Sequence, residues 1–218
     1  MTPKEFVKAW PILMKQVRSL KVPWLDEVAA EGRDPFKVLI SCILSLRTQD
    51  KVTGEASRRL FNLAQTPEAL SRLPVRLIEK TIYPVGFYRV KAKNIKEMSA
   101  EIIAKHHGRV PDTIEELLTL KGVGRKTANL VITLGYKKDG ICVDTHVHRI
   151  PNRWGLITTK TPHQTEFTLR EILPVRYWKE LNSHLVAFGQ GICKPISPLC
   201  SQCKIQSFCD RVGVTYHR

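Results

Sequence analysis

A chain of 218 residues with 43% hydrophobic and 25% charged residues has the composition of a globular protein with one large or two small domains. Its 35 basic and 20 acidic residues leave a net charge of +15. This surplus predicts a polyanionic partner, nucleic acid or an acidic membrane face, and the plain alternative is a basic surface kept for solubility. No apolar run approaches the roughly 18 residues that span a bilayer. We therefore expect a cytoplasmic, nucleoid-associated location. Of the two polyanions we expect nucleic acid as the partner, and no membrane.

The first half of the chain carries the hydrophobic spacing of helices. Residues 36–46, "FKVLISCILSL", are apolar on most sides, which is typical of a helix buried in the core. Asp34-Pro35 is a plausible start signal directly before it. The segments "TGEASRRLFNLA" and "TPEALSRL" continue with helical spacing.

Helical signals continue through the middle of the chain. The segment "KAKNIKEMSAEIIAKHHG" has apolar residues at helical spacing and ends at Gly108, a typical helix stop. Thr113 and Glu116 fit a capping box that opens "IEELLTL". No alternating stretch indicates a strand, so the sequence predicts an all-α fold.

Four of the six cysteines fall within the short segment "CKPISPLCSQCKIQSFC". In a compartment where thiols stay reduced, four thiolates this close predict a metal site; they are Cys193, Cys200, Cys203 and Cys209. Structural zinc sites usually show paired C-x2-C spacing, which only one pair here has, and a [4Fe–4S] cluster also takes four thiolates. Spacing leaves zinc and the cluster open. Cys42 and Cys142 stand apart in apolar surroundings and are expected to be packed thiols.

Gly122-Val123-Gly124 separates two predicted helices and directly precedes "RKTANLVITL". A tight glycine turn exposes backbone N–H groups at the start of the second helix, which suits a phosphate group. An ordinary helix connector is the plain alternative. Together with the basic charge, the turn predicts a clamp on a DNA backbone.

Lys126 and Asp144 are the candidate catalytic pair. The start of a helix disfavours a cation, so Lys126 should lose its proton readily and act as a nucleophile that forms a Schiff base with a sugar carbon. The alternative is a solvated charge or a phosphate contact. Asp144 follows 18 residues later, and its alternative role is a helix cap. A second metal site from Asp144, His146 and His148 is disfavoured because these side chains would splay apart.

Three motifs carry a resemblance to a known family: "LKGVGRKTAN" at 120–129, "VDTHVHR" at 143–149 and the C-x6-C-x2-C-x5-C tail. With weaker matches in "GFYRVKAKNI" and "GRVPDTIEELLTL", the chain resembles the endonuclease III family of DNA glycosylases in the helix-hairpin-helix superfamily. The resemblance implies a [4Fe–4S] cluster, a six-helix barrel domain over 25–136, and a helical domain from 1–24 and 137–218 that carries the cluster loop at 193–209. It also implies a monomer.

The resemblance further implies a bifunctional DNA glycosylase and AP lyase of base excision repair. Lys126 matches the family's nucleophile, which attacks the deoxyribose C1′ of an extruded nucleotide and displaces the base, and β-elimination then cuts the strand 3′ to the lesion. Asp144 matches the residue that activates the lysine and stabilises positive charge on the sugar. The implied partner is double-stranded DNA that contains damaged bases, usually oxidised pyrimidines, or abasic sites.

The same resemblance implies a set of DNA-binding residues. Backbone N–H groups of the glycine turn would hold phosphate and Phe87 would wedge into the duplex, and the full expected set is Gly122, Val123, Gly124, Arg125, Arg47, Gln49, Phe87 and His146. Lys121 replaces a common proline, which adds a charge and would loosen the turn. Where the family often has a glutamine that fills the gap left by the flipped base, the candidates are Arg47 by register and Gln49 by type. An arginine favours hydrogen bonding to an orphaned guanine.

Two rival interpretations accompany this one. The first is a monofunctional glycosylase acting on uracil or thymine in mismatches, with Lys126 only contacting DNA. The second is a non-catalytic iron–sulfur DNA-binding module. The pair of Lys126 and Asp144 argues against both, because simple binding needs neither residue.

Overall fold

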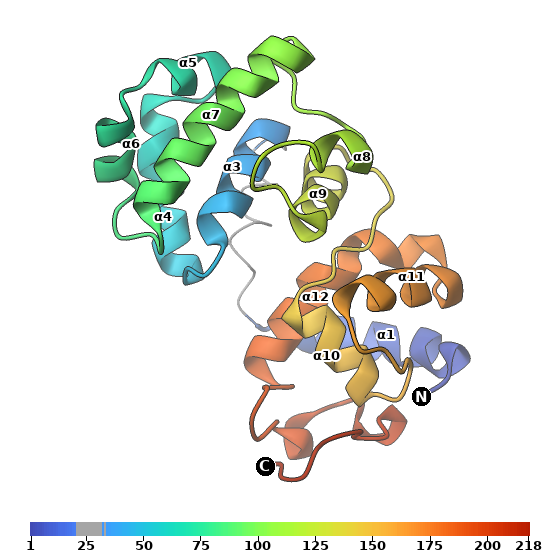
Figure 1. Ribbon diagram of the computed structural model, residues 1–218. Helices are drawn as coiled ribbons and strands as arrows, with labels where there is room; N and C mark the ends of the chain where they lie inside the picture. The colour runs from blue at the N-terminus through green and yellow to red at the C-terminus, as the bar shows by residue number, and fades with distance from the viewer. Residues whose placement is uncertain (21–31, 33) are drawn as a thin grey trace. The chain divides into compact units, whose positions relative to one another are not determined.

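The computed structural model describes residues 1–20, 32 and 34–218, and these residues contain helices and no strand, which confirms the predicted all-α class (Figure 1). The helices are Pro3–Val17 (α1), Pro35–Ser45 (α3), Asp50–Leu63 (α4), Pro67–Arg72 (α5), Val75–Ile82 (α6), Tyr88–His106 (α7), Ile114–Leu117 (α8), Arg125–Leu130 (α9), Thr145–Arg153 (α10), Pro162–Ile172 (α11) and Trp178–Gly191 (α12). Short turns of 3-10 or π type cover Val131–Gly135 (η1), Val175–Tyr177 (η2), Cys200–Gln202 (η3) and Gln206–Phe208 (η4).

The chain divides into two compact units. Unit 1 combines Met1–Pro23 with Ile141–Arg218, and unit 2 is Trp24–Gly140. The predicted boundary between residues 24 and 25 lies outside the described residues, and the predicted domain bounds stay a prediction. No described helix is both long and apolar enough to cross a membrane.

Unit 2 is built around α3 and α7. The Asp34 carboxylate caps α3 by accepting from the N–H groups of Phe36 and Lys37, and Pro35 occupies the first turn, as the sequence predicts. Nearly every side chain of α3 from Phe36 to Leu44 is buried. Helix α7 packs against α3, α5 and α6 (Figure 1).

The segment after α7 differs in detail from the prediction. Helix α7 ends at His106, its C-cap residue His107 has a left-handed φ of 53°, and Gly108 follows with φ 76°. Thr113 caps α8 through its hydroxyl oxygen, which accepts from the Glu116 N–H. The predicted capping box is only half formed, because the Glu116 carboxylate accepts from the Thr113 hydroxyl rather than from its backbone N–H. The side chains bond to each other, and α8 ends at Leu117, sooner than its apolar pattern suggests.

Unit 1 has its own core between α1, α10, α11 and α12. Helix α1 opens with a complete capping box between Thr2 and Glu5 and buries one apolar face. Its aromatic residues Phe6 and Trp10 pack with Trp154, at the end of α10, and Phe188 on α12. This core fixes the start of α10 and the loop that carries the clustered cysteines.

Candidate functional site

The glycine turn in unit 2 joins α8 to α9. Gly122 has φ 85°, a left-handed conformation that favours glycine, and Gly124 is the residue that caps α9. The Val123 side chain is buried and its N–H donates to the Leu120 carbonyl at 3.0 Å. This differs from the expected phosphate contact, since the Val123 N–H closes the turn and the residue anchors the loop. Gly122 and Gly124 donate their N–H groups to no other described residue.

Lys126 is exposed in the first turn of α9, as the second residue of that helix. Its positive charge is close enough to α3 to influence the pKa of the buried Cys42 thiol. Burial raises the pKa of Cys42 to about 12, and the positive charge of Lys126 opposes that rise. Cys42 is a buried, packed thiol, as predicted.

Lys121, the residue that replaces the family's proline, is paired. Its Nζ lies 3.0 Å from Glu97 Oε2 on α7. This hydrogen bond lowers the pKa of the Glu97 carboxyl. The expected loosening of the turn by Lys121 is therefore countered by a contact that ties the turn to α7.

Asp144 belongs to unit 1 and caps α10. Its Oδ1 accepts from the backbone N–H groups of His146 and Val147, both at 2.8 Å. Both bonds reach one oxygen, so the capping role uses only half of the carboxylate. Asp144 is thus a helix cap, the alternative role given above, and this role does not use its other oxygen, Oδ2.

His146 and His148 have separate partners on α10. The His146 ring lies against Gly189 of α12, where an added Cβ would collide with Nδ1, and Nδ1 is 3.2 Å from the Arg149 guanidinium. His148 Nδ1 is 2.7 Å from the Thr165 hydroxyl. The two histidine rings therefore contact different residues, Arg149 for His146 and Thr165 for His148.

Arg47 and Phe87 lie side by side in unit 2, although they come from different loops. The Arg47 guanidinium carbon is 5.7 Å from the centre of the Phe87 ring. Phe87 is 62% exposed, and Arg47 is exposed as well. Gln49, the alternative candidate, is exposed at the start of α4 and caps that helix with no side-chain hydrogen bond. Of the two candidates, Arg47 is therefore the one that contacts Phe87.

Lys91, on α7 next to the loop that carries Arg47, is a residue that the sequence reasoning missed. Only 6% of it is exposed, and its Nζ donates to the Leu44 carbonyl at 2.9 Å, to the Leu46 carbonyl and to the Thr48 hydroxyl. Burial lowers the pKa of Lys91 to about 8. Helical spacing is the signal that could have found it, since it shares a buried stripe of α7 with Ile95.

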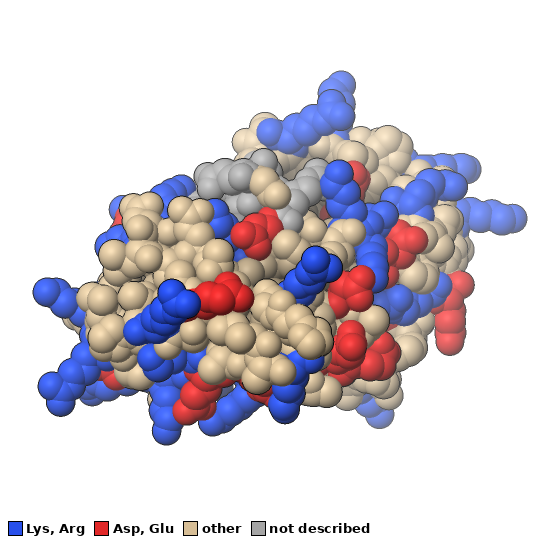
Figure 2. Space-filling model, turned by 90° about the horizontal axis from the view of Figure 1, so that it is seen from above, with Lys and Arg blue, Asp and Glu red and all other residues tan. Residues whose placement is uncertain are grey.

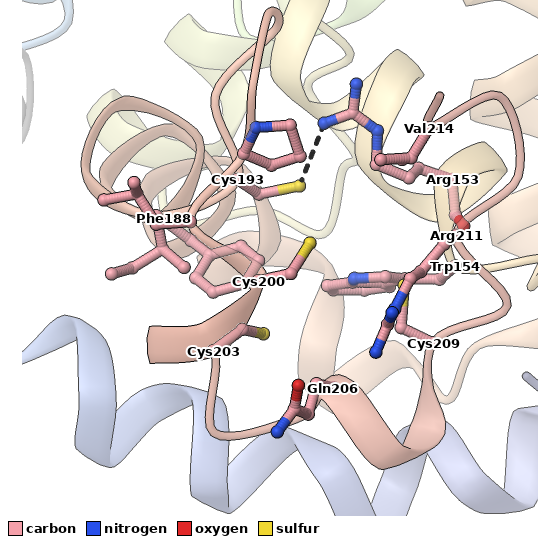
Figure 3. A pocket seen from close by; sticks show the side chains of 13 residues that line it. Arg153, Trp154, Phe188, Cys193, Cys200, Cys203, Gln206, Cys209, Arg211 and Val214 are labelled. Atoms are coloured by element: carbon pink, nitrogen blue, oxygen red, sulfur yellow. Dashed lines mark hydrogen bonds between the residues drawn. The ribbon is translucent and has the colours of Figure 1, made fainter. Parts of the chain in front are cut away.

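The four clustered cysteines line one small pocket in unit 1, shown in Figure 3. Apolar side chains, including Trp154 and Phe188, share the lining. Arg153, a buried residue of α10, donates to Cys193 Sγ at 3.4 Å and to the carbonyls of Lys194 and Pro195. The Arg153 guanidinium therefore contacts both a thiol and the loop beside it, and the sequence reasoning missed this residue.

The chemistry of these thiols fits a cationic metal centre. Burial raises the pKa values of Cys193 and Cys209, and raises that of Cys203 to about 11, where the other three cysteines add to the rise. Four thiolates this close repel one another, and a cationic centre offsets that repulsion. Among the described residues, no group of three or more Cys, His, Asp or Glu side chains is arranged to hold a metal ion. The fit is therefore one of residue type, burial and charge.

Basic side chains are spread over the surface. Figure 2 shows Lys and Arg projecting from the visible face at many places, with Asp and Glu among them. This agrees with a +15 charge distributed along the chain rather than gathered in a tail.

Comparison with known proteins gives consistent matches. The family model of the HhH-GPD superfamily base excision DNA repair proteins matches residues 40–175. Endonuclease III of Thermotoga maritima is 48% identical over 177 residues, which cover 81% of this chain and 83% of that protein.

Two solved structures are similar over nearly the whole chain. A trapped endonuclease III–DNA covalent intermediate, in an estranged-adenine complex, matches with a TM-score of 0.86 and 32% identity over 97% of both chains. A thermostable thymine-DNA glycosylase matches with a TM-score of 0.84 and 25% identity, covering 95% of this chain and 96% of that one. These matches confirm the predicted fold.

Proposed function

This chain belongs to the endonuclease III family within the HhH-GPD superfamily of base excision DNA repair proteins, and we propose that Lys126 and Asp144 carry out its DNA glycosylase and AP lyase reactions. The proposed substrates are oxidised pyrimidines in duplex DNA. The observation that carries the proposal is the exposed amine of Lys126, presented in the first turn of α9 directly after the glycine turn.

The proposed reaction begins with Lys126. Its neutral amine attacks the deoxyribose C1′, the C1′–N bond of the damaged base breaks, and the base leaves with the bonding electrons and takes up a proton. Loss of a proton from nitrogen and opening of the sugar ring leave a Schiff base between Lys126 and C1′. Removal of a C2′ proton then breaks the C3′–O bond, which cuts the strand 3′ to the lesion. Water finally releases the lysine.

Asp144 supports this chemistry in the proposal. Its capping bonds hold the carboxylate at the start of α10 through Oδ1. The remaining oxygen can accept a proton from the attacking amine, and the negative charge stabilises positive charge that develops on the sugar. One side chain thus has both a structural and a chemical role.

The proposed DNA contacts follow the glycine turn. The N–H groups of Gly122 and Gly124 would donate to backbone phosphate, with Arg125 and His146 as further contacts, and Val123 would support the turn from below. Extrusion of the target nucleotide brings its C1′ to the lysine. Double-stranded DNA with damaged bases or abasic sites is thus the proposed partner.

Arg47 and Phe87 are proposed to fill the gap left by the extruded nucleotide. The exposed Phe87 ring offers an apolar surface for stacking on neighbouring bases, and the Arg47 guanidinium lies against it. A guanidinium can donate two hydrogen bonds to the O6 and N7 atoms of guanine. We therefore propose that this chain prefers lesions opposite guanine.

Arg47→Ala tests that preference. We expect wild type to cleave thymine glycol opposite guanine faster than opposite adenine, and the variant to lose about 1–3 kcal/mol of this discrimination, the worth of one bidentate base contact. The measurement is single-turnover cleavage with each of the four opposite bases. Gln49→Ala is the matched control and should keep the preference. The same loss with Gln49→Ala alone would transfer the role to Gln49.

The proposed cofactor is a [4Fe–4S] cluster, the group that the endonuclease III family generally carries. The four cysteines of the pocket in unit 1 would supply its thiolate ligands. When bound, the cluster would tie the loop at 193–209 to the core of unit 1. The chemical fit described above supports this cofactor, and zinc is the remaining alternative.

Cys203→Ala tests the cluster. We expect wild type purified without air to contain about four iron atoms per chain and to absorb visible light, and the variant to lose both signals because one of the four ligands is missing. Elemental analysis and an absorption spectrum measure this. Cys142→Ala removes a buried thiol elsewhere and should retain full iron content. One zinc ion per wild-type chain, with no iron, would contradict the cluster.

A monofunctional thymine glycosylase is the alternative function that an observation favours, because a thymine-DNA glycosylase is among the similar structures. A binding module without catalysis is the other alternative. Strand cleavage at a pre-formed abasic site separates them from our proposal, because neither alternative cuts the strand. Cleavage by wild type at neutral pH is the expected result. No cleavage of the abasic site, together with release of the base from a duplex that still carries it, would instead establish the monofunctional reaction.

A monomeric state and a nucleoid-associated, cytoplasmic location stay predictions.

A further inference from the structure

The buried ammonium group of Lys91 joins two loops of unit 2. It reaches from α7 to the end of α3, where it donates to the carbonyls of Leu44 and Leu46 and to the hydroxyl of Thr48. Carbonyls at the end of a helix have no partner within the helix, so Lys91 supplies the donors they need. Its three acceptors also match the three donors of an ammonium group.

The second loop joins this network through Thr48. The Gly86 N–H donates to the Thr48 hydroxyl oxygen at 3.1 Å. The two loops also touch directly, because a Cβ at Gly86 would come within 2.6 Å of the Arg47 carbonyl oxygen. The loop at 46–49 and the loop at 84–87 are therefore joined at Gly86, which hydrogen-bonds to Thr48 and lies against the Arg47 carbonyl, and the Lys91 ammonium group bonds to the first of these loops.

This arrangement places two exposed side chains in uncommon backbone conformations. Arg47 has φ 53° and Phe87 has φ 57°, both in the left-handed region that non-glycine residues seldom occupy. Such conformations persist only where surrounding contacts enforce them, and they are concentrated at functional sites. The hydrogen bonds of Lys91 and Thr48 are the contacts that enforce them here.

We propose that Lys91 is a positioning residue for opposite-base recognition, which holds Arg47 and Phe87 stacked as one rigid pair. The inference rests on the proposed function, because it assumes that this pair enters the gap opposite the lesion. Lys91 does not touch DNA in this account. It acts through the two loops, so its removal should erase the effect of Arg47 without removing the Arg47 side chain.

The test measures binding, so that it does not depend on the lysine chemistry. The probes are duplexes with tetrahydrofuran in place of the damaged nucleotide, opposite guanine or adenine. Lys91→Met keeps the length of the side chain and removes its donors. Lys96→Met is the matched control, because Lys96 lies on the same helix and donates to the Ser71 and Leu73 carbonyls away from both loops.

We expect wild type to bind the guanine duplex about tenfold tighter than the adenine duplex, in keeping with one bidentate contact to a base. Lys91→Met should lower this ratio to that of Arg47→Ala, and combining the two changes should lower it no further. Lys96→Met should keep the wild-type ratio. Thr48→Val, which removes only the hydroxyl between the loops, should lower the ratio in part and serves if Lys91→Met does not fold.

Three results would overturn the proposal: no guanine preference in wild type, an unchanged ratio in both Lys91→Met and Thr48→Val, or an equal loss in Lys96→Met. Hydride trapping of wild type on abasic DNA, run in parallel, tests the proposed function separately. If the binding ratios change as expected but no adduct is trapped, the role of Lys91 stands and the Schiff base is rejected. If an adduct is trapped but the ratio is unchanged in Lys91→Met and Thr48→Val, the Schiff base stands and the role of Lys91 is rejected.

Discussion

Lys126→Gln is expected to lose strand cleavage at abasic sites by at least about 10³-fold, the scale of loss when a catalytic nucleophile is removed. The amide of glutamine cannot form a Schiff base. Affinity for the same duplex should change little, because phosphate contacts elsewhere along the chain carry the binding. Single-turnover cleavage and equilibrium binding to a duplex with a non-cleavable abasic analogue measure the two quantities.

Lys126→Arg separates the nucleophile from its charge. The arginine keeps a cation in the first turn of α9 but does not act as a nucleophile at neutral pH. Like the glutamine variant, it should bind and not cleave. Substantial cleavage by the arginine variant would show that only a positive charge is needed at this position, and Lys126 would then be a DNA contact.

Asp144→Asn should slow base excision by about 10²–10⁴-fold, the range typical of a lost general base, while leaving thermal stability nearly unchanged. The structure supplies the reason for this separation. Asp144 caps α10 through one oxygen that accepts two backbone N–H bonds, and the amide oxygen of asparagine can accept the same bonds. The change removes the negative charge and replaces the second oxygen, the proposed proton acceptor, with an NH2 group. Single-turnover rates on thymine glycol and a thermal unfolding curve are the measurements.

Asp144→Ala provides the matched comparison, because it removes both the charge and the cap. It should lose about 0.5–2 kcal/mol of stability in addition to the activity. If Asp144→Asn were fully active and Asp144→Ala were merely less stable, the cap would be the whole role of this residue.

Local signals in the sequence predicted much of this structure. Asp34 and Pro35 start α3 as expected, because a cap and a first-turn proline act within a few residues of their own position. The cysteine segment likewise folds around one pocket, because its residues are close in the chain. Thr113 shows the limit of such signals. The residue types of a capping box are present, but the second bond forms between side chains.

The contacts that sequence reasoning missed join distant segments. Lys91 is 47 residues from Leu44, whose carbonyl it caps, so no local pattern links them. The stacking of Arg47 on Phe87 depends on the same packing. The buried stripe of α7 places Lys91 in the core, yet only the fold reveals which carbonyls it meets. The Val123 N–H is a similar case, because the turn itself uses a donor that the sequence leaves open for phosphate.

The central claim is that the Lys126 amine forms a covalent intermediate with DNA. The most direct test is borohydride reduction of wild type on a duplex that contains thymine glycol, followed by mass spectrometry of the cross-linked peptide. We predict a stable adduct, carried by Lys126 and absent from Lys126→Gln. An adduct on another residue, or base release from the duplex with no adduct in wild type, would contradict the claim.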